Sequence, residues 1–149
     1  MIIPIASDHA GFQAKIEVKK ILESLGYLTI DFGTHSEDSV DYPDYAVLVA
    51  KAVSSGEYEK GILICGSGQG MCMTANKYSD VRAALVWNPE LASLSVQHNN
   101  ANVLCLPGRY LSPDELKLII ESWLKAHFEG GRHQNRVDKI SKVTKTDQE

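Results

Sequence analysis

The sequence predicts an α/β protein of the Rossmann-like class, with a five-stranded parallel sheet covered by helices on both faces. Five short apolar runs alternate with longer amphipathic segments, which is typical of repeated strand–helix–strand units. The run GILIC at 61–65 is apolar without alternation, as expected for a strand that is buried on both faces. The chain has 149 residues, 44% hydrophobic and 23% charged, which suits a single domain with its own core.

Each predicted strand is a short apolar run bounded by turn residues. Pro4 counts against a central position for the first strand, because proline donates no hydrogen bond to a neighbouring strand. The strands are expected over 2–7 (IIPIAS), 27–32 (YLTIDF), 61–65 (GILIC), 82–87 (RAALVW) and 102–107 (NVLCLP).

The predicted helices begin and end at recognisable signals. Gly26 follows the first helix as a stop, and Pro89 lies in the first turn of the fourth. Ser112 and Glu115 form a capping-box pattern at the start of the fifth. The helices are expected over 12–25, 42–56, a segment starting near Gly70, 89–98, 112 to about 128 and about 133–143, with a mobile tail over 144–149.

The composition argues against several classes of function. The net charge is −4 and no basic run exceeds two residues, so a nucleic-acid surface is not expected, although a few placed arginines could hold a small anion. The apolar stretches are far shorter than the roughly 20 residues of a membrane span. The N-terminus has no basic segment of the kind that begins a signal peptide. Three cysteines without a CxxC pair indicate reduced thiols in a cytoplasmic protein.

A glycine-rich turn follows the third predicted strand, at the sheet edge where ligands bind in such folds. Gly66, Gly68 and Gly70 remove side chains from this turn, so backbone N–H groups can point at an anion. The spacing matches neither the GxGxxG pattern of dinucleotide sites nor a P-loop.

Cys65 lies at the start of this glycine turn. A helix N-terminus beside it would lower the pKa of the thiol below its free value of about 8.5. The thiolate could then be a nucleophile or a base, whereas the alternative is a buried strand cysteine that packs as a small apolar residue. A cysteine-nucleophile phosphatase would need an arginine in the following loop, and residues 66–70 contain none. Cys72 and Cys105 are predicted to be packing residues.

Asp8 and His9 follow the first predicted strand and so lie at the same edge. A carboxylate and an imidazole placed together can bind sugar hydroxyls or move protons. The alternative is that Asp8 caps the next helix while His9 is merely exposed.

His98 and Asn99 belong to a polar segment that precedes the fifth predicted strand, which places them at the opposite, amino edge. Five strand residues separate the two edges by roughly 16 Å. If His98 works with Cys65, it is expected to come from a neighbouring subunit. The alternative is a polar helix end with a chance histidine.

Arg132 and Arg136 are four residues apart and would share one helical face. Two guanidiniums so placed repel each other unless an anion such as a phosphate lies between them. The alternative is a solvated basic helix start. The preceding helix returns the chain to the amino edge, so these arginines are also candidates for a partner's site. The cysteines and histidines lack zinc-type spacing, so we predict no metal.

Taken together, these segments resemble the type B ribose-5-phosphate isomerases, which form one family with the galactose-6-phosphate and allose-6-phosphate isomerases. The resemblance implies a three-layer α/β/α sandwich, no cofactor or metal, and a homodimer or homotetramer with sites shared between subunits. It covers nearly the whole chain, through SDHAGF, DYPDYA, GILICGSGQGM, ANK, RAAL, HNNANVL, LPGR and GGRHQNRV in that order.

The resemblance also assigns roles by matching position. It implies that Cys65 abstracts the substrate proton and that His98 helps to open the furanose ring, a step for which Asp8 is the other candidate. Ser67 stands where threonine is common and keeps the hydroxyl, and Cys65 places the chain in the cysteine-using branch of the family. The substrate-binding positions implied are Asp8, His9, Gly66, Ser67, Gly68, Gln69, Gly70, Asn99, Arg109, Arg132 and Arg136.

The function implied is the interconversion of D-ribose 5-phosphate and D-ribulose 5-phosphate through a cis-enediolate, a step of the pentose phosphate pathway. A six-carbon substrate, allose 6-phosphate or galactose 6-phosphate, is the nearest alternative. A non-catalytic module that binds a sugar phosphate is the alternative of another class. Such a module would not need Cys65, Ser67 and His98 together.

Overall fold

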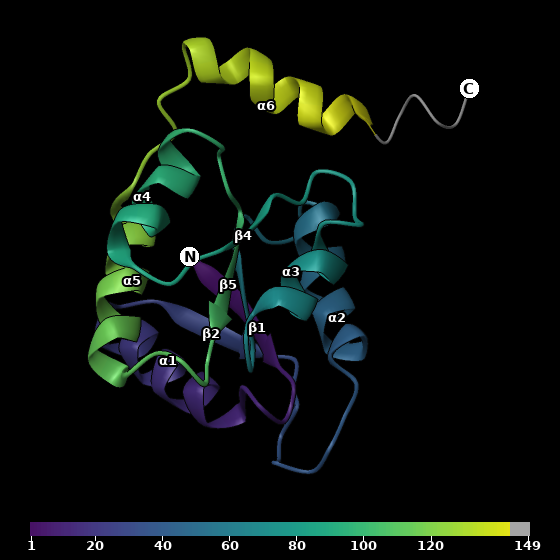
Figure 1. Ribbon diagram of the computed structural model, residues 1–149, viewed down its shortest axis with the longest axis vertical. Helices are drawn as coiled ribbons and strands as arrows, with labels where there is room; N and C mark the ends of the chain where they lie inside the picture. Colours follow the sequence, from purple (N-terminus) through teal and green to yellow (C-terminus); the bar gives the residue numbers. More distant parts are fainter. Residues whose placement is uncertain (144–149) are drawn as a thin grey trace.

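A computed structural model describes residues 1–143, and the tail predicted over 144–149 lies outside the described residues. Five parallel strands form one sheet in the order β2–β1–β3–β5–β4 (Figure 1), which confirms the predicted class. The strands are β1 (Ile2–Ser7), β2 (Leu28–Asp31), β3 (Gly61–Cys65), β4 (Ala83–Leu85) and β5 (Val103–Pro107). The helices are α1 (Phe12–Ser24), α2 (Tyr42–Ser54), α3 (Gln69–Ala75), α4 (Pro89–Gln97), α5 (Pro113–Lys125) and α6 (Arg132–Val143).

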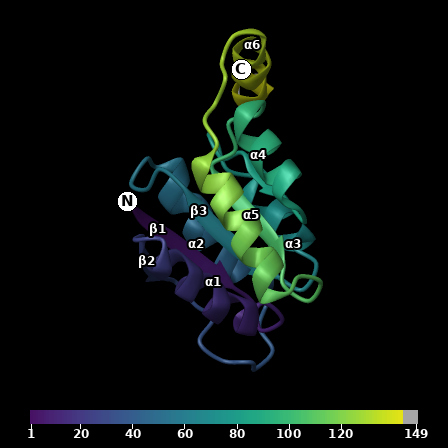
Figure 2. The ribbon, with the colours of Figure 1, turned by 90° about the vertical axis from the view of Figure 1, so that its left-hand side faces the viewer.

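Helices cover both faces of the sheet, as the continuous apolar run of β3 predicts. On one face, α1, α4 and α5 pack over the strands, and Trp123 of α5 is fully buried there. On the other face, α2 and α3 pack through Val49 and Met71, which are also fully buried. The three-layer α/β/α sandwich is therefore confirmed (Figures 1 and 2). No helix within residues 1–143 has the length and apolar character needed to cross a bilayer.

The sixth helix, α6, lies outside these layers, beyond the end of α4 (Figure 2). Only His133 and Val137 of this helix are buried. The backbone N–H of Glu129 donates to the Gln97 carbonyl at 3.0 Å, which fixes the segment before α6 against the end of α4. The first turn of α6 is thereby held at the amino edge of the sheet.

The observed boundaries differ from the predicted ones at a few places. β1 is a central strand between β2 and β3, so the expectation drawn from Pro4 was wrong. Pairing with β3 begins only at Ile5, one residue later, so the missing N–H of Pro4 costs no bond on that side. α5 ends at Lys125 because Ala126 is extended, with φ −72° and ψ 147°. The capping box of Ser112 and Glu115 is present as predicted.

A buried ion pair anchors the segment between β2 and α2. Lys15 of α1 is 1% exposed, and its ammonium donates to Asp31 Oδ1 at 2.8 Å and also to the Thr34 carbonyl. Burial lowers the pKa of Lys15, although Asp31 opposes this. Burial raises the pKa of Asp31, but hydrogen bonds from Lys15, Gly33 and Lys19 outweigh it and leave this pKa below its ordinary value. The carboxylate's contribution to stability is therefore present near neutral pH and is lost as pH falls through the lowered pKa.

Replacing Asp31 by asparagine is expected to destabilise the protein by about 3 kcal/mol, because the substitution leaves a buried ammonium without its counter-charge. The matched control is Lys19→Ala, since Lys19 binds the other carboxylate oxygen at 3.0 Å but is 40% exposed. That change should cost less than about 1 kcal/mol. Urea unfolding at neutral pH measures both values, and equal costs for the two variants would contradict the role of burial.

Candidate active site

Three loops meet at the carboxyl edge of the sheet, after β1, β3 and β5. The N–H of Asp8 donates to the Ile64 carbonyl at 3.3 Å, which ties the first loop to the end of β3. The N–H groups of Gly108 and Arg109 donate to the carbonyls of Cys65 and Gly66, at 2.9 and 3.1 Å. The chain runs from β1 outward to β2 and then crosses back to β3, so β1 and β3 flank a switch point of the kind at which ligands bind.

Cys65 is the last residue of β3, and its side chain faces the α2–α3 layer. It belongs to the same buried cluster as Leu63 and Met71 and is 5% exposed. Cys65 therefore packs as a small apolar residue, as the alternative in the sequence analysis expects. The next residue, Gly66, already lies in the glycine turn at the edge of the sheet.

The two other cysteines are packing residues, as predicted. Cys105 of β5 is fully buried, and burial raises the pKa of its thiol well above the ordinary value. Cys72 of α3 packs against the same cluster, and its Sγ donates to the Ala83 carbonyl at 3.4 Å. Neither thiol lies in the glycine turn.

The glycine turn closely approaches its neighbours, and side chains would not fit there. Gly68 has a left-handed φ of +76°, and a Cβ on it would lie 2.6 Å from Leu85 Cδ1. A Cβ on Gly70 would lie 2.6 Å from the ring of Tyr42. Within residues 1–143, the N–H groups of Gly66, Ser67 and Gly68 donate to no protein acceptor. These three N–H groups are available to an anionic oxygen, as the sequence predicts.

Replacing Gly68 by alanine is expected to cost about 2–4 kcal/mol of stability, because the new Cβ adds a clash to left-handed backbone strain. Gly56→Ala is the matched control: its φ is +80°, but nothing lies within 4 Å of a Cβ there. The control should lose only about 1–2 kcal/mol, the cost of the backbone strain. Thermal or urea unfolding compares the two, and similar losses would show that the turn tolerates a side chain.

Asp8 and His9 line a cavity of about 380 Å³ together with the start of α2. Asp8 Oδ1 accepts the N–H of Gly11 at 3.0 Å, which leaves the second oxygen for a ligand. The predicted alternative was wrong, because the N-cap of α1 is Gly11, without a side-chain cap hydrogen bond, and His9 lines the cavity. His9 Nδ1 accepts the N–H of Val40 at 3.2 Å, which leaves Nε2 as the protonated nitrogen of a neutral ring.

Tyr42 is a site residue that the sequence reasoning missed. It is the first residue of α2, it lines the cavity of Asp8 and His9, and its ring covers Gly70. No periodic pattern links residues 42 and 70, and the only sign of Tyr42 was its place in the DYPDYA segment. Because Cys65 also faces the α2–α3 layer, the thiol and this cavity lie on the same face of the sheet.

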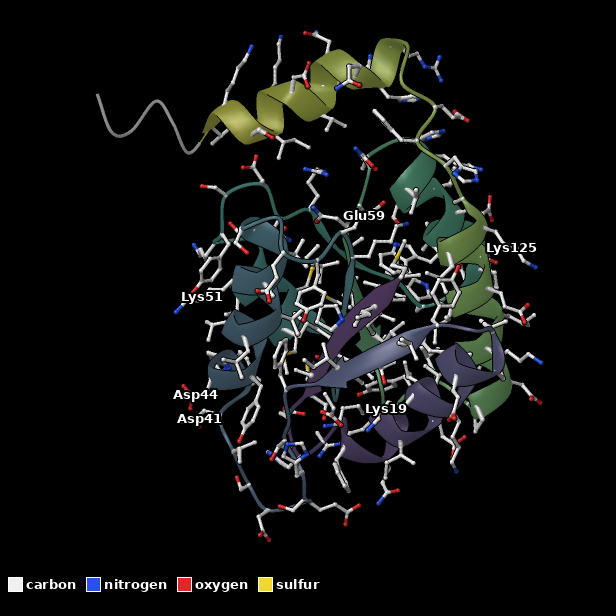
Figure 3. The ribbon with its side chains drawn as sticks, turned by 180° about the vertical axis from the view of Figure 1, so that it is seen from behind. Lys19, Asp41, Asp44, Lys51, Glu59 and Lys125 are labelled. Carbon is white, nitrogen blue, oxygen red and sulfur yellow. The ribbon has the colours of Figure 1, made fainter. Side chains whose placement is uncertain are left out.

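The charge around this cavity is negative. Its lining includes three carboxylates, Asp8, Asp41 and Asp44, and the last two lie at the start of α2 (Figure 3). His9 is the single cation-forming side chain in that lining. A doubly charged phosphate would therefore need guanidiniums from elsewhere.

A larger cavity of about 490 Å³ opens on the β4–β5 side of the turn. Ser67 and Gln69 reach it from the turn, and its other walls include Trp87, Tyr110 and Glu115. The smaller cavity, lined by Asp8, His9 and the start of α2, lies on the face of the sheet that Cys65 faces, so it suits the predicted chemistry better. Arg109 lies in the loop that follows β5 and reaches the glycine turn. Its Nη1 is 3.2 Å from the position that a Cβ on Gly66 would occupy.

The remaining predicted residues lie at the amino edge. His98 follows α4, while Arg132 and Arg136 are exposed on the first turns of α6. Asn99 lines a separate cavity of about 410 Å³ that α6 borders through Ile140. Val103 begins β5 opposite Gly61, and Cys65 is four residues further along β3, or roughly 13 Å away. Within one chain, Cys65 and the predicted residues of the amino edge therefore lie at opposite ends of the strands, in agreement with the argument from the sequence.

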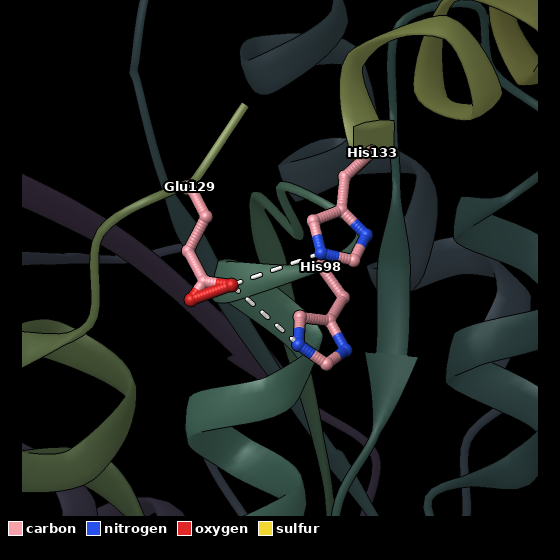
Figure 4. Close-up of side chains that lie close together, drawn as sticks. All are labelled: His98, Glu129 and His133. Atoms are coloured by element: carbon pink, nitrogen blue, oxygen red, sulfur yellow. Dashed lines mark ion pairs between the residues drawn. The ribbon is translucent and has the colours of Figure 1, made fainter. Parts of the chain in front are cut away.

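His98 has two neighbours that its sequence context does not reveal. Its imidazole stacks on that of His133, with ring centroids 4.3 Å apart and planes inclined by 13°. Glu129 Oε1 lies 3.7 Å from Nε2 of each ring (Figure 4). Burial lowers the pKa of His133, as do His98 and the arginines of α6, whereas Glu129 raises it.

Comparison with known proteins shows where this architecture occurs. The family model described as Ribose/Galactose Isomerase matches residues 3–140. The ribose-5-phosphate isomerase B of Escherichia coli K12 is 45% identical over 141 residues, which cover 95% of each chain. The structure of Clostridium thermocellum ribose-5-phosphate isomerase B is 48% identical, with a TM-score of 0.95 over 98% of this chain and 99% of that one.

A third similar protein was solved with a ligand. The ribose-5-phosphate isomerase B of Mycoplasma genitalium, with bound ribulose 5-phosphate, is 46% identical and has a TM-score of 0.92. The match covers 97% of this chain and 96% of that one. By sequence model, sequence identity and structure alike, the chain belongs to the Ribose/Galactose Isomerase family.

Proposed function

We propose that this protein is an aldose–ketose isomerase that interconverts D-ribose 5-phosphate and D-ribulose 5-phosphate through a cis-enediolate. The observation that carries the proposal is the carboxyl edge, where β3 ends in Cys65 and the glycine turn that follows has three free N–H groups. The similarity to a structure that holds ribulose 5-phosphate supports the choice of substrate. We place the reaction in the pentose phosphate pathway of the cytoplasm, where the three unpaired cysteines would stay reduced.

The reaction begins with ring opening, because ribose 5-phosphate rests mainly as a furanose. A proton must pass to the ring oxygen while another leaves the anomeric hydroxyl. We assign this transfer to His98 of a second copy of the chain, with Asp8 as the other candidate. The imidazole of His98 is partly exposed, so a sugar bound in the site of another chain can reach it. Asp8 lines the same cavity as His9, and one of its carboxylate oxygens remains free.

The isomerisation itself follows from the position of Cys65. Its thiolate removes the proton from C2 of the open aldose, and the electron pair moves to form an enediolate. The N–H groups of Gly66, Ser67 and Gly68 stabilise the negative charge on O1 and O2, and one such donor contributes about 3 kcal/mol. The Ser67 hydroxyl passes a proton between the two oxygens. Cys65 then returns its proton to C1, which gives ribulose 5-phosphate.

The phosphate is bound by guanidiniums that the cavity does not supply from its own lining. We propose that Arg132 and Arg136 of a second copy hold it, with Arg109 of the same chain beside the turn and Asn99 of the second copy near the sugar. The carboxylates of Asp8, Asp41 and Asp44 in the cavity lining would repel a phosphate, which supports guanidiniums supplied by a second copy of the chain. This arrangement makes the working unit a homodimer or a tetramer of such dimers. No cofactor takes part in the scheme.

Arg136→Ala is expected to raise KM for ribose 5-phosphate about 10- to 100-fold, because a hydrogen bond between charged groups is lost. Folding stability should be unchanged, since Arg136 is exposed. Lys139→Ala is the control, because Lys139 is an exposed cation on the same helix. Steady-state kinetics measures the effect, and an unchanged KM for the Arg136 variant would remove this arginine from the site.

The function is tested by incubating the purified protein with ribose 5-phosphate and following ribulose 5-phosphate. We expect turnover without added metal. Turnover of allose 6-phosphate or galactose 6-phosphate in preference would identify the six-carbon alternative. Binding of the sugar phosphate with no product would identify the non-catalytic module and overturn the proposal.

A further inference from the structure

We propose that His98, Glu129 and His133 form a binding site for a transition-metal cation such as Zn²⁺, and that the cation inhibits the enzyme by occupying His98. The three side chains come from three segments: the end of α4, the segment after α5 and the first turn of α6. One ligand atom from each lies within 4.8 Å of the other two. Figure 4 shows the Glu129 carboxylate facing both imidazoles.

The distances are close to those of a bound cation. Zinc binds imidazole nitrogen and carboxylate oxygen at about 2.0–2.2 Å, so tetrahedral ligand atoms lie about 3.3 Å apart. Glu129 Oε1 is 3.7 Å from His98 Nε2 and 3.7 Å from His133 Nε2. A few tenths of an ångström of closure would bring the Glu129 oxygen to ligand distance. The two rings are nearly parallel, so they must also tilt toward each other before both Nε2 lone pairs point at one ion.

The exposure of the side chains allows this adjustment. His98 is 39% exposed and Glu129 is 51% exposed, so both can turn, whereas His133 at 11% supplies a fixed position. The open side leaves room for a water molecule as fourth ligand, as in zinc sites with three protein ligands.

The donor set selects the kind of cation. Two imidazoles and one carboxylate suit Zn²⁺, Co²⁺, Ni²⁺ or Cu²⁺, whereas Mg²⁺ and Ca²⁺ prefer oxygen ligands only. Arg132 and Arg136 add positive charge nearby, so the affinity will be lower than that of a structural zinc site. The sequence did not indicate this site, because its ligands stand at 98, 129 and 133 and match no zinc spacing. The inference thus revises the expectation that the chain binds no metal.

The inhibitory consequence rests on the proposed function. A metal-bound imidazole has lost the lone pair with which it would accept a proton, so His98 could not open the sugar ring. The cation would also stand beside the arginines that we assign to the phosphate. Zn²⁺ would thus act on the amino-edge half of the site and leave Cys65 untouched.

The site is tested with the full-length protein freed of metal by a chelator. Titration with Zn²⁺ against a chromophoric chelator should show one ion per chain. His133→Ala and Glu129→Gln should each weaken binding at least tenfold, and Glu129 is exposed enough for its variant to fold. His127→Ala is the control, because His127 is an exposed histidine outside the cluster and should leave binding unchanged.

A second measurement separates this site from the thiols. Co²⁺ in place of Zn²⁺ should give a spectrum without the charge-transfer absorption of a cobalt–thiolate bond. Thiolate absorption, or unchanged affinity in both variants, would overturn the proposal. Binding is measured without substrate, so a protein that binds Zn²⁺ but does not isomerise sugars would refute the function alone. A protein that isomerises sugars in the presence of Zn²⁺ as fast as in its absence would refute the inhibition.

Discussion

Cys65→Ala is expected to reduce kcat for ribose 5-phosphate by at least about 10³-fold, because it removes the group that carries the proton between C2 and C1. No other side chain in the turn can replace it, since Ser67 is a much weaker base. Binding of the sugar phosphate should remain within a few-fold of the wild type, because the glycine N–H groups and the arginines are unchanged. The measurements are steady-state kinetics and calorimetric titration with substrate.

The chain offers a matched control in Cys72→Ala. Cys72 packs against the same buried cluster but lies in α3 and not in the glycine turn. Its removal should cost some stability and leave kcat nearly unchanged. If the Cys65 variant kept more than a few per cent of wild-type activity, the base would have to be another group, and the packing role of Cys65 would be its main one.

Mixing two inactive variants is expected to restore activity, because we assign the two halves of each site to different chains. Cys65→Ala lacks the carboxyl-edge half, and His98→Ala lacks the amino-edge half. A mixed dimer then contains one intact site, made of the first variant's His98 and the second variant's Cys65. Random pairing at equal amounts makes half of the dimers mixed, so activity should return to about a quarter of the wild-type value.

The control for this experiment combines two defects in the same half. Cys65→Ala and Asp8→Ala both affect the carboxyl edge, so no pairing of these chains produces an intact site. Refolding the variants together, followed by the isomerase assay, measures both mixtures. Recovery in the control mixture, or none in the first, would show that the site does not combine chains in the proposed way.

Much of the fold was predictable because it depends on local patterns. The unbroken apolar run of β3 indicated a strand buried on both faces, and Ser112 with Glu115 marked the start of α5 through a local hydrogen-bond exchange. The expectation drawn from Pro4 was wrong because the hydrogen bond that a proline loses depends on where the neighbouring strand begins pairing, which is not a local property. The edge to which each loop belongs followed from strand order along the chain, and this placed Cys65 and His98 on opposite edges.

The parts of the site that escaped prediction depend on contacts between distant segments. Tyr42 covers Gly70 only because α2 and α3 pack on the same face of the sheet. His133 stacks on His98 because the segment after α5 is hydrogen-bonded to the end of α4. Neither contact leaves a periodic or spaced signal in the sequence, so packing in three dimensions was needed to reveal it.

The roughly 13 Å between Cys65 and the amino edge also has a kinetic meaning. An isolated chain would have no complete catalytic centre, so specific activity should fall on dilution below the dissociation constant of the assembly. The rate would then depend on the square of the protein concentration, and reconcentration would reverse the loss. At low protein concentration, the activity would therefore be limited by assembly of the chains rather than by affinity for the sugar phosphate.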